Sequence, residues 1–168
     1  MTTLPAALGG GDGLAVWRLE ERTYAATWDS GEGPFLYGGR WNSKGVRTVY
    51  CALDPAVAIL EVAVPTGFRT LDTVPYMLTA ARIADIAQVH VVKSEVVPNP
   101  NWLRPGSPSA GQQAFGADLL RRHRFVAIPS AVSRHSWNLI FDPIKANGFY
   151  NLDFQEPFAL DTRLHPPA

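Results

Sequence analysis

The sequence has little of what several classes of protein require. It holds one cysteine, Cys51, which excludes an internal disulfide and a cysteine-rich zinc site. Its 15 lysines and arginines equal its 15 aspartates and glutamates, so no overall positive field attracts nucleic acid. It has no apolar run near 18 residues and no charged, apolar leader. We therefore expect a soluble, cytoplasmic protein that neither enters a membrane nor binds nucleic acid directly.

The signatures of metal sites and serine hydrolases are also missing. The four histidines match no spacing typical of metal ligands, so we predict no metal site. Ser130 does not lie in a G-x-S-x-G turn, although His135 and Asp142 are near it in the sequence. A hydrolase that uses these three residues stays an alternative, because a catalytic triad depends on a geometry that a sequence does not show.

What is present is the composition of one globular domain. The chain has 168 residues, of which 46% are hydrophobic and 18% charged, so it can bury an ordinary core. Residues 1–13 are expected to form a flexible lead-in to a single domain over 14–164. The pattern predicts helices at about 55–63 and 109–123, and strands at 15–19, 48–52, 76–82, 86–92, 125–128, 139–141 and 158–160. Because this alternation is irregular, we predict an α+β fold without a run of β-α-β units.

The segment after Asp54 contains the most informative polar residue. Asp54 and Pro55 are typical of a helix N-terminus, and every residue of 56–64 is apolar except Glu61. At helical spacing Glu61 shares one face with Val57, Leu60 and Val64. We expect that face to be buried, where an unpaired carboxylate is costly. Glu61 is therefore either a member of a structural ion pair or a catalytic group.

Residues 38–42, Gly-Gly-Arg-Trp-Asn, are a candidate binding loop. The two glycines let the backbone turn or approach a ligand closely. Arg40, Trp41 and Asn42 then supply a cation, an aromatic plane and an amide in succession. Such a loop can hold a phosphate, stack on a flat ring and orient a hydroxyl group. The alternative is a hairpin corner with Trp41 packed into the core.

Three more candidates lie in or near predicted strands. Arg18 is either a solvent-facing residue of an edge strand or a guanidinium aimed at an anionic ligand, which its planar fork suits. Ser130 comes at the end of a strand, where reactive groups are frequent. Asn138 begins the next strand and either orders the Ser130 loop or faces a ligand.

Taken together and in this order, these segments resemble the RES-domain family of bacterial toxins, which is named for an arginine, a glutamate and a serine. Those three residues map onto Arg18, Glu61 and Ser130, and further motif positions fall on Arg40, Tyr50 and Asn138. One small departure is Asp142, where an asparagine is expected before the proline. The matching stretches are V-W-R-L at 16–19, G-G-R-W-N-S-K-G at 38–45, V-Y-C-A at 49–52, A-I-L-E-V at 58–62, V-A-I-P-S-A-V at 126–132 and N-L-I-F-D-P at 138–143.

The resemblance implies a fold similar to ADP-ribosyltransferases, with a split β-sheet core and a cleft that binds NAD. It also implies a type II toxin–antitoxin system, in which a helix-turn-helix antitoxin of the Xre type blocks the toxin's cleft. NAD is then the substrate, and no cofactor is expected. Family members degrade NAD by hydrolysis or phosphorolysis, and some resemble true ADP-ribosyltransferases.

The candidate residues suit that chemistry. Arg18 or Arg40 can grip the pyrophosphate of NAD by charge-assisted hydrogen bonds. Nicotinamide leaves as a neutral pyridine, so charge develops on the ribose as an oxocarbenium ion, which Glu61 can stabilise. Trp41 or Tyr50 can stack on a flat ring.

Ser130 has two conceivable roles in this reaction, to orient the nicotinamide ribose or to place the attacking water or phosphate. The sequence leaves three hypotheses: a toxin that consumes NAD, a protein ADP-ribosyltransferase with the same cleft, and an inactive binding partner of an antitoxin. The presence of all three residues that name the family disfavours the third.

Overall fold

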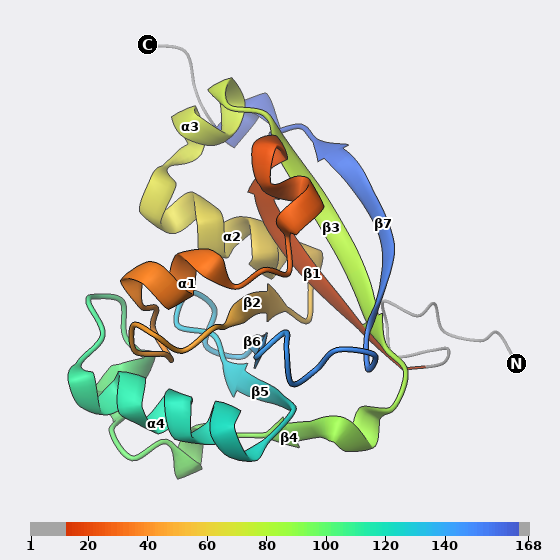
Figure 1. Ribbon diagram of the computed structural model, residues 1–168. Helices are drawn as coiled ribbons and strands as arrows, with labels where there is room; N and C mark the ends of the chain where they lie inside the picture. Colours follow the sequence, from red (N-terminus) through yellow and green to blue (C-terminus); the bar gives the residue numbers. More distant parts are fainter. Residues whose placement is uncertain (1–12, 165–168) are drawn as a thin grey trace, which may run out of the picture.

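The computed structural model describes residues 13–164, and its core is one seven-stranded mixed sheet (Figure 1). In sheet order the strands are β4 (Val89–Val91), β5 (Phe125–Pro129), β6 (Trp137–Phe141), β2 (Val49–Ala52), β1 (Leu14–Glu21), β3 (Tyr76–Ile83) and β7 (Asn151–Phe158). The α-helices are α1 (Glu32–Tyr37), α2 (Pro55–Thr66), α3 (Phe68–Thr73) and α4 (Ala110–Arg122), and the 3-10 turns are η2 (Arg22–Thr27), η3 (Ile86–Gln88), η4 (Ser94–Val96), η5 (Pro100–Leu103) and η6 (Thr162–Leu164). The lead-in expected at 1–13 lies outside the described residues, apart from Gly13.

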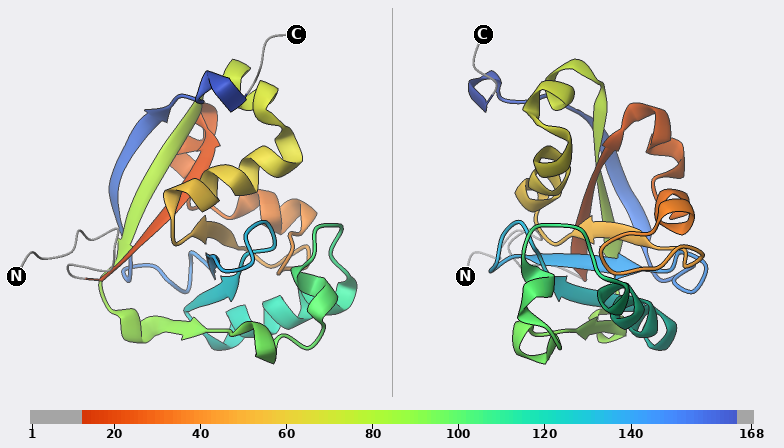
Figure 2. Two further views of the ribbon diagram at one scale, coloured as in Figure 1. Left: turned by 180° about the vertical axis from the view of Figure 1, so that it is seen from behind. Right: turned by 90° about the vertical axis from the view of Figure 1, so that its left-hand side faces the viewer.

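The sheet is split between β1 and β2. These strands pair only through Trp17 and Ala52, whereas β1 pairs with β3 along its whole length and β2 pairs with β6. One half is therefore β1-β3-β7 and the other is β2-β6-β5-β4, in which only the β4–β5 pair is parallel. In the right-hand view of Figure 2 the strands of the two halves cross at a steep angle. The predicted α+β fold with a split sheet is confirmed.

The second half of the sheet is covered on both faces. All five residues of β5 are buried, and alternate side chains point to opposite faces of the strand. Phe125 packs with Leu139 in one core cluster, whereas Val126 and Ile128 pack in another cluster that includes Leu119 of α4. Burial on both faces explains why this segment is continuously apolar in sequence.

Helix α2 begins as predicted and ends later. Asp54 caps it by accepting hydrogen bonds from the backbone N–H groups of residues 56 and 57, at 2.8 and 3.2 Å. The predicted end at residue 63 is wrong, because Pro65 is accommodated in the last turn and the helix runs to Thr66. The expectation of a buried face through Glu61 is met only in part, since Val57 is buried but Val64 is 57% exposed. The buried residues of this helix are Val57, Ala58 and Ala63, so Glu61 lies beside the packed stripe.

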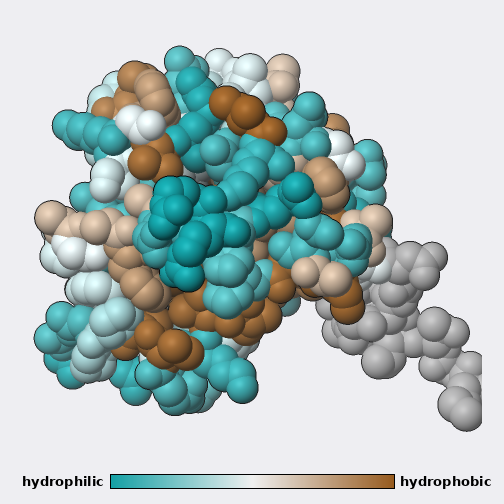
Figure 3. Space-filling model, turned by 60° about the horizontal axis from the view of Figure 1, so that its bottom comes forward, coloured by the Kyte–Doolittle hydropathy of each residue, from teal (hydrophilic) through white to brown (hydrophobic). Residues whose placement is uncertain are grey.

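Helix α4 lies against the 38–42 loop because of Gly116. A Cβ atom at this position would collide with the backbone carbonyl of Trp41, so only glycine permits this approach. Glycine has a low helix propensity, but here it allows the helix to pack against the loop. On the exposed side of α4, Asp118 forms ion pairs with Arg121 and Arg122 at 2.6 and 2.7 Å. Figure 3 views the molecule from below, where the surface is largely hydrophilic with hydrophobic patches between.

The strand predicted at 158–160 is wrong in position, because β7 covers residues 151–158 instead. It lies at the edge of the sheet and is mostly exposed, so its sequence carries little of the hydrophobic pattern that marks a strand. An ion pair of 3.0 Å between Arg82 and Asp153 joins it to β3. Among residues 13–164, no helix is both long and apolar enough to cross a membrane.

Candidate active site

A cavity of about 130 Å³ lies where β1 and β2 diverge, next to α2 and the 38–42 loop. Sequence-predicted site residues from five segments of the chain line it. Asn42 and Ser130 are not in its lining, which consists of Trp17, Arg18, Leu19, Arg40, Trp41, Tyr50, Cys51, Ala52, Ala58, Glu61 and Asn138. The split in the sheet thus creates the space that the motif residues share.

Arg18 bridges the two diverging strands. Its Nη1 donates a hydrogen bond of 2.8 Å to the carbonyl oxygen of Tyr50 on β2. Strand β1 lies inside the sheet, between β2 and β3, so the alternative of a solvent-facing arginine on an edge strand is wrong. The side chain keeps 28% of its surface exposed, and it lines the cavity. It therefore offers a fixed cation to an anionic ligand.

Glu61 is held by Ser130. The Ser130 hydroxyl donates a hydrogen bond of 2.8 Å to Oε1 of Glu61 and accepts bonds of 3.2 Å from the backbone N–H groups of Val132 and Ser133. Ser130 itself is only 1% exposed. Glu61 forms no ion pair within the described part of the chain, so the structural ion-pair alternative is wrong. The arrangement is a carboxylate at the cavity, oriented from behind by a buried hydroxyl.

This contact also bears on the alternative of a serine hydrolase. The hydroxyl of Ser130 is bonded to Glu61, whereas the Asp142 carboxylate accepts a bond from the backbone N–H of Ile144. No hydrogen bond joins Ser130 to His135 among the described residues. The triad geometry is therefore not formed.

Tyr50 and Asn42 shape the 38–42 loop. The Tyr50 hydroxyl donates to Oδ1 of Asn42 at 2.6 Å and accepts from the backbone N–H of Trp41 at 2.9 Å. Asn42 is fully buried, and its amide nitrogen donates to three backbone carbonyls of the same region. Burial raises the pKa of Tyr50 well above its usual value. The asparagine amide is thus used to fold the loop, and the expectation that it orients a ligand hydroxyl is not met.

Gly39 is required by this arrangement. A Cβ atom on it would lie 2.6 Å from the Tyr50 hydroxyl and 2.7 Å from Oδ1 of Asn42. The close approach predicted from the glycine pair is therefore an approach to the protein's own side chains.

Trp41 and Arg40 mainly stabilise the cavity wall. Trp41 is 1% exposed and contacts Phe115 edge-on, with ring centroids 6.2 Å apart, so the core-packing alternative describes it better than ring stacking does. The Arg40 guanidinium donates to the carbonyls of Trp102, Arg104 and Gly106, at 3.4, 3.3 and 3.2 Å. It holds the proline-rich loop beside the cavity while still contributing to the lining.

Asn138 and Cys51 also line the cavity. Nδ2 of Asn138 donates a long hydrogen bond of 3.4 Å to the Cys51 carbonyl. Burial raises the pKa of the Cys51 thiol to about 12, so it stays protonated and packs as a small apolar group. In residues 13–164, no group of three or more His, Cys, Asp and Glu side chains could hold a metal ion.

Sequence reasoning missed Glu20, which lies two residues after Arg18 on the same face of β1. Glu20 is only 6% exposed, and burial raises its pKa from 4.5 to about 7. The alternation of side chains along a strand could have identified Glu20 as a site residue, because it places the carboxylate on the same face as Arg18.

A second cavity of about 330 Å³ adjoins Arg18 and Glu20. Turn η2 and helix α1 form its other walls, and two tyrosines stand at its border. Tyr24 is 60% exposed and Tyr37 is 77% exposed. Arg18 is thus a wall common to both cavities.

An arginine and a glutamate line one cavity, and a serine is hydrogen-bonded to that glutamate. This arrangement agrees with comparisons to known proteins. The family model described as RES domain matches residues 15–161. The chain belongs to the RES-domain family. Toxin Res of Yersinia enterocolitica is 39% identical to this RES domain over 156 residues, which cover 90% of this chain and 99% of that protein. Toxin Res of Photorhabdus laumondii is 28% identical over 155 residues, which cover 90% and 97%.

Two further similarities concern activity and fold. The protein named Prs ADP-ribosylating toxin, from a Sphingobium species, is 29% identical over 140 residues, which cover 76% of this RES domain and 81% of that protein. The crystal structure of the M. tuberculosis MbcT-MbcA toxin–antitoxin complex contains a similar fold, with a TM-score of 0.72 and 21% identity over 88% of this chain and 85% of that chain. At that identity the likeness supports the fold alone.

Proposed function

We propose that this RES domain is the toxin of a toxin–antitoxin pair and that it acts by cleaving the nicotinamide–ribose bond of NAD. The observation that carries the proposal is the arrangement of Glu61, which Ser130 orients at a small cavity that also contains the Arg18 guanidinium. The names of the Yersinia and Photorhabdus relatives support the toxin part of it.

The size of the cavity suggests how NAD would lie. At about 130 Å³ it is smaller than the roughly 300–1,000 Å³ typical of pockets for whole ligands of this class. It suits the nicotinamide end of NAD, and the remainder has to extend past its rim. Because Arg18 is shared with the second cavity, we place the pyrophosphate on Arg18 and the adenosine half toward Tyr24 and Tyr37.

The chemistry assigned to Glu61 is electrostatic. As the C1′–N bond breaks, nicotinamide takes the bonding electrons and leaves neutral, and positive charge develops on the ribose. A preorganised carboxylate stabilises that charge more strongly than it stabilises the ground state. Ser130 contributes by holding Oε1 of Glu61; it is buried and does not line the cavity, so we propose a positioning role for it. Water or phosphate then forms the new bond to C1′ and releases its proton to solvent.

Transfer of ADP-ribose to a protein is the second candidate, and the name of the Sphingobium relative favours it. Both reactions use the same residues up to the acceptor step. Incubation with NAD labelled in the adenosine part separates them: free ADP-ribose or its 1-phosphate indicates hydrolysis or phosphorolysis, and label on protein indicates transfer. Omission of phosphate identifies the small-molecule acceptor.

The partner we propose is an antitoxin of the Xre helix-turn-helix type that covers the cleft. We further propose that the toxin acts in the cytoplasm and needs NAD as substrate but no cofactor. Expression of the chain alone in a bacterium should arrest growth and lower the NAD pool, and co-expression with such an antitoxin should prevent both. The matched control is the Glu61→Gln variant, which should accumulate as folded protein without arrest. Normal growth and an unchanged NAD pool with soluble parent protein would contradict the toxin proposal.

A further inference from the structure

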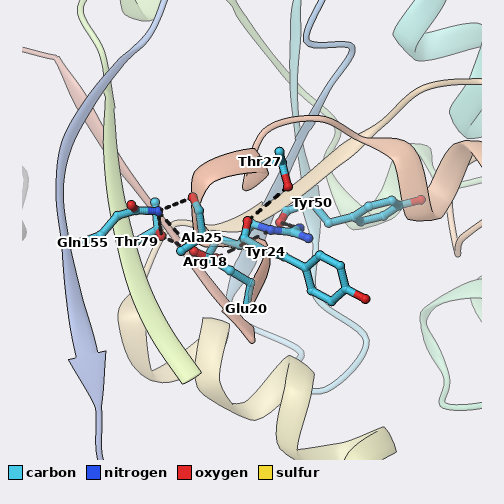
Figure 4. Close-up of polar contacts among 8 residues, drawn as sticks. All are labelled: Arg18, Glu20, Tyr24, Ala25, Thr27, Tyr50, Thr79 and Gln155. Atoms are coloured by element: carbon cyan, nitrogen blue, oxygen red, sulfur yellow. Dashed lines mark hydrogen bonds and ion pairs between the residues drawn. The ribbon is translucent and has the colours of Figure 1, made fainter. Parts of the chain in front are cut away.

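Two buried polar atoms face each other behind the proposed pyrophosphate site. Nε of Arg18 and Oε2 of Glu20 lie 3.8 Å apart, within ion-pair range but beyond a hydrogen bond, and neither has a hydrogen-bond partner (Figure 4). In the part of the chain that the structure describes, Nε2 of His123 is the only other buried side-chain atom of this kind. Buried polar groups are normally satisfied, so this pair requires an explanation.

Glu20 is anchored through its other oxygen. The Thr79 hydroxyl donates a hydrogen bond to Oε1 of Glu20, and Nε2 of Gln155 lies 3.4 Å from the same oxygen. Gln155 is itself fixed by bonds of 2.9 Å to the Thr79 hydroxyl and 2.8 Å to the Ala25 carbonyl. Thr79 on β3 lies opposite Arg18, and Gln155 on β7 lies opposite Thr79. Three neighbouring strands therefore hold the carboxylate with Oε2 directed at Arg18.

Arg18 needs such an anchor to present a ligand site. A guanidinium has five N–H donors in one plane, and the 2.8 Å bond from Nη1 to the Tyr50 carbonyl restrains only one side of that plane. A second contact at Nε would fix the orientation of the plane and leave the remaining N–H groups for a ligand. Figure 4 shows the Arg18 guanidinium between Tyr50 and Glu20.

We propose that Glu20 is a positioning residue for NAD, whose carboxylate holds Nε of Arg18 so that the free N–H groups of the guanidinium meet the pyrophosphate. This inference rests on the proposed function, because it takes the pyrophosphate to bind at Arg18. The negative charge of Glu20 also repels the pyrophosphate. The repulsion between Glu20 and the pyrophosphate acts over a longer distance than the contact with Arg18, and water screens it because the Arg18 side chain is partly exposed. A misoriented guanidinium, in contrast, loses its charge-assisted hydrogen bonds to the pyrophosphate. We therefore expect orientation to outweigh repulsion.

The proposal has a consequence for pH. Burial raises the pKa of Glu20 to about 7, against the opposing effects of the Thr79 hydrogen bond, the Arg18 charge and the Gln155 hydrogen bond. The carboxyl gains a proton as the pH falls through 7 and then no longer attracts Nε. The KM for NAD should therefore rise on the acid side of this pH, while kcat changes little.

Other titratable groups lie near Glu20 and could complicate that profile. Besides Arg18 on the same strand, they are Cys51 on β2, whose thiol has a pKa of about 12, and Tyr24 and Glu32, which line the adjoining cavity. The groups that face Glu20 from β3 and β7, Thr79 and Gln155, carry no charge. A variant at Glu20 itself is thus needed to assign the pH dependence.

The test is the steady-state kinetics of NAD consumption at pH values on both sides of 7. Glu20→Gln keeps an acceptor for Thr79 and Gln155 but places an amide, without negative charge, opposite Nε. Its KM above pH 7 should be higher than the parent's by about tenfold, on the scale of one lost charge-assisted contact, and should lack the inflection. The matched control is Glu21→Gln, which removes the adjacent carboxylate from the opposite face of β1 and should leave the KM and its profile as in the parent.

A second variant separates positioning from a merely structural role. Thr79→Val removes a hydrogen bond that favours the ionised form of Glu20, so the inflection in KM should move to higher pH. This shift is readable even if Glu20→Gln folds poorly. A purely structural role would instead lower the melting temperature and the active fraction, and would leave the KM and its inflection where they are in the parent.

The outcomes distinguish this inference from the function on which it rests. A folded parent protein that does not consume NAD would contradict the proposed function, and the role of Glu20 would fall with it. A parent that consumes NAD, together with a Glu20→Gln variant of the same KM and pH profile, would overturn the role of Glu20 alone. A lower KM in Glu20→Gln would also overturn it, because it would mean that charge repulsion outweighs orientation.

Discussion

Ser130 donates a hydrogen bond of 2.8 Å to Glu61, although the two residues are 69 positions apart in the sequence. Glu61 lies on α2, which packs against β1, and Ser130 follows β5 in the other half of the sheet. The bond therefore joins the two halves across the cleft. It fixes one oxygen of the carboxylate that we propose faces the developing charge on the ribose.

The first prediction concerns the charge of Glu61. Glu61→Gln keeps an oxygen that can accept from Ser130 but removes the negative charge. We expect kcat to fall by about 10²-fold or more, the scale seen when one preorganised electrostatic group is lost. The KM should change much less, and the melting temperature should stay close to the parent's. A variant that melts like the parent and consumes NAD at a similar rate would remove Glu61 from the mechanism.

The second prediction separates Ser130 from Glu61. Ser130→Ala leaves the backbone N–H groups of Val132 and Ser133 without their acceptor, which should cost about 1–3 kcal/mol of stability. It should lower kcat less than Glu61→Gln does, because the carboxylate remains but is less well oriented. If Ser130 acts through Glu61, the double variant should lose little more activity than Glu61→Gln alone. Additive losses in this double-mutant cycle would instead give Ser130 its own contact with the substrate.

The third prediction concerns Arg18 and NAD affinity. In a Glu61→Gln background, which slows turnover during the titration, Arg18→Ala should weaken NAD binding by about 1.5–3 kcal/mol, the contribution of a hydrogen bond to a charged group. Arg18→Lys should fall between the two, because it keeps the charge but not the planar fork. Calorimetric titration measures both. Equal affinities in all three proteins would place the pyrophosphate away from Arg18.

The fourth prediction tests the second cavity as the place of the adenosine half. Stacking of a base on an aromatic ring contributes about 1–3 kcal/mol, so Tyr24→Ala and Tyr37→Ala should raise the KM for NAD. Nicotinamide mononucleotide lacks adenosine, so its KM should not change. The matched Tyr→Phe variants keep the rings and should behave like the parent. An equal effect on both substrates would argue against adenosine binding there.

The fifth prediction is thermodynamic and does not depend on any substrate. The pKa of Glu20 rises from 4.5 to about 7 on folding, so its folded form holds the proton more tightly. Its contribution to stability is complete below pH 4.5 and is lost as the pH rises through 7. Glu20→Gln has no titrating carboxyl at this position and does not lose this stability. The free energy of unfolding of the variant minus that of the parent should therefore increase with pH, by an amount on the order of 3 kcal/mol. Urea denaturation at several pH values measures it, and a difference that is constant with pH would contradict the raised pKa.

The sequence identified residues of this site where they belong to a family motif or to a regular hydrophobic pattern. Arg18, Glu61 and Asn138 were placed in the cleft from sequence, and the split sheet followed from the family resemblance. The hydrogen bond from Ser130 to Glu61 could not be predicted, because it depends on how two halves of a sheet meet. Nor could the sequence show that Asn42 uses its amide within the loop, since a buried and a ligand-facing asparagine have the same local pattern.

Two further differences have definite physical causes. Strand β7 was placed too late because an exposed edge strand lacks the alternating apolar residues on which the prediction depended. The buried face of α2 was misplaced because helical spacing identifies neighbours and not the side that meets the sheet: Val64 is exposed, whereas Ala58 and Ala63 are buried. Glu20, by contrast, was within reach of the sequence, since continuing the alternation of the strand predicted at 15–19 by one residue places it on the same face as Arg18.

The bond between Ser130 and Glu61 also sets an order of events during synthesis. A ribosome that has made α2 has produced the carboxylate but not the hydroxyl that orients it, and Ser130 comes 69 residues later. Strand β7, which pairs with β3 at the edge of the sheet and supplies Gln155, comes later still. Nascent and prematurely released chains therefore lack a complete site. The assembled site therefore forms only after nearly the whole chain has left the ribosome.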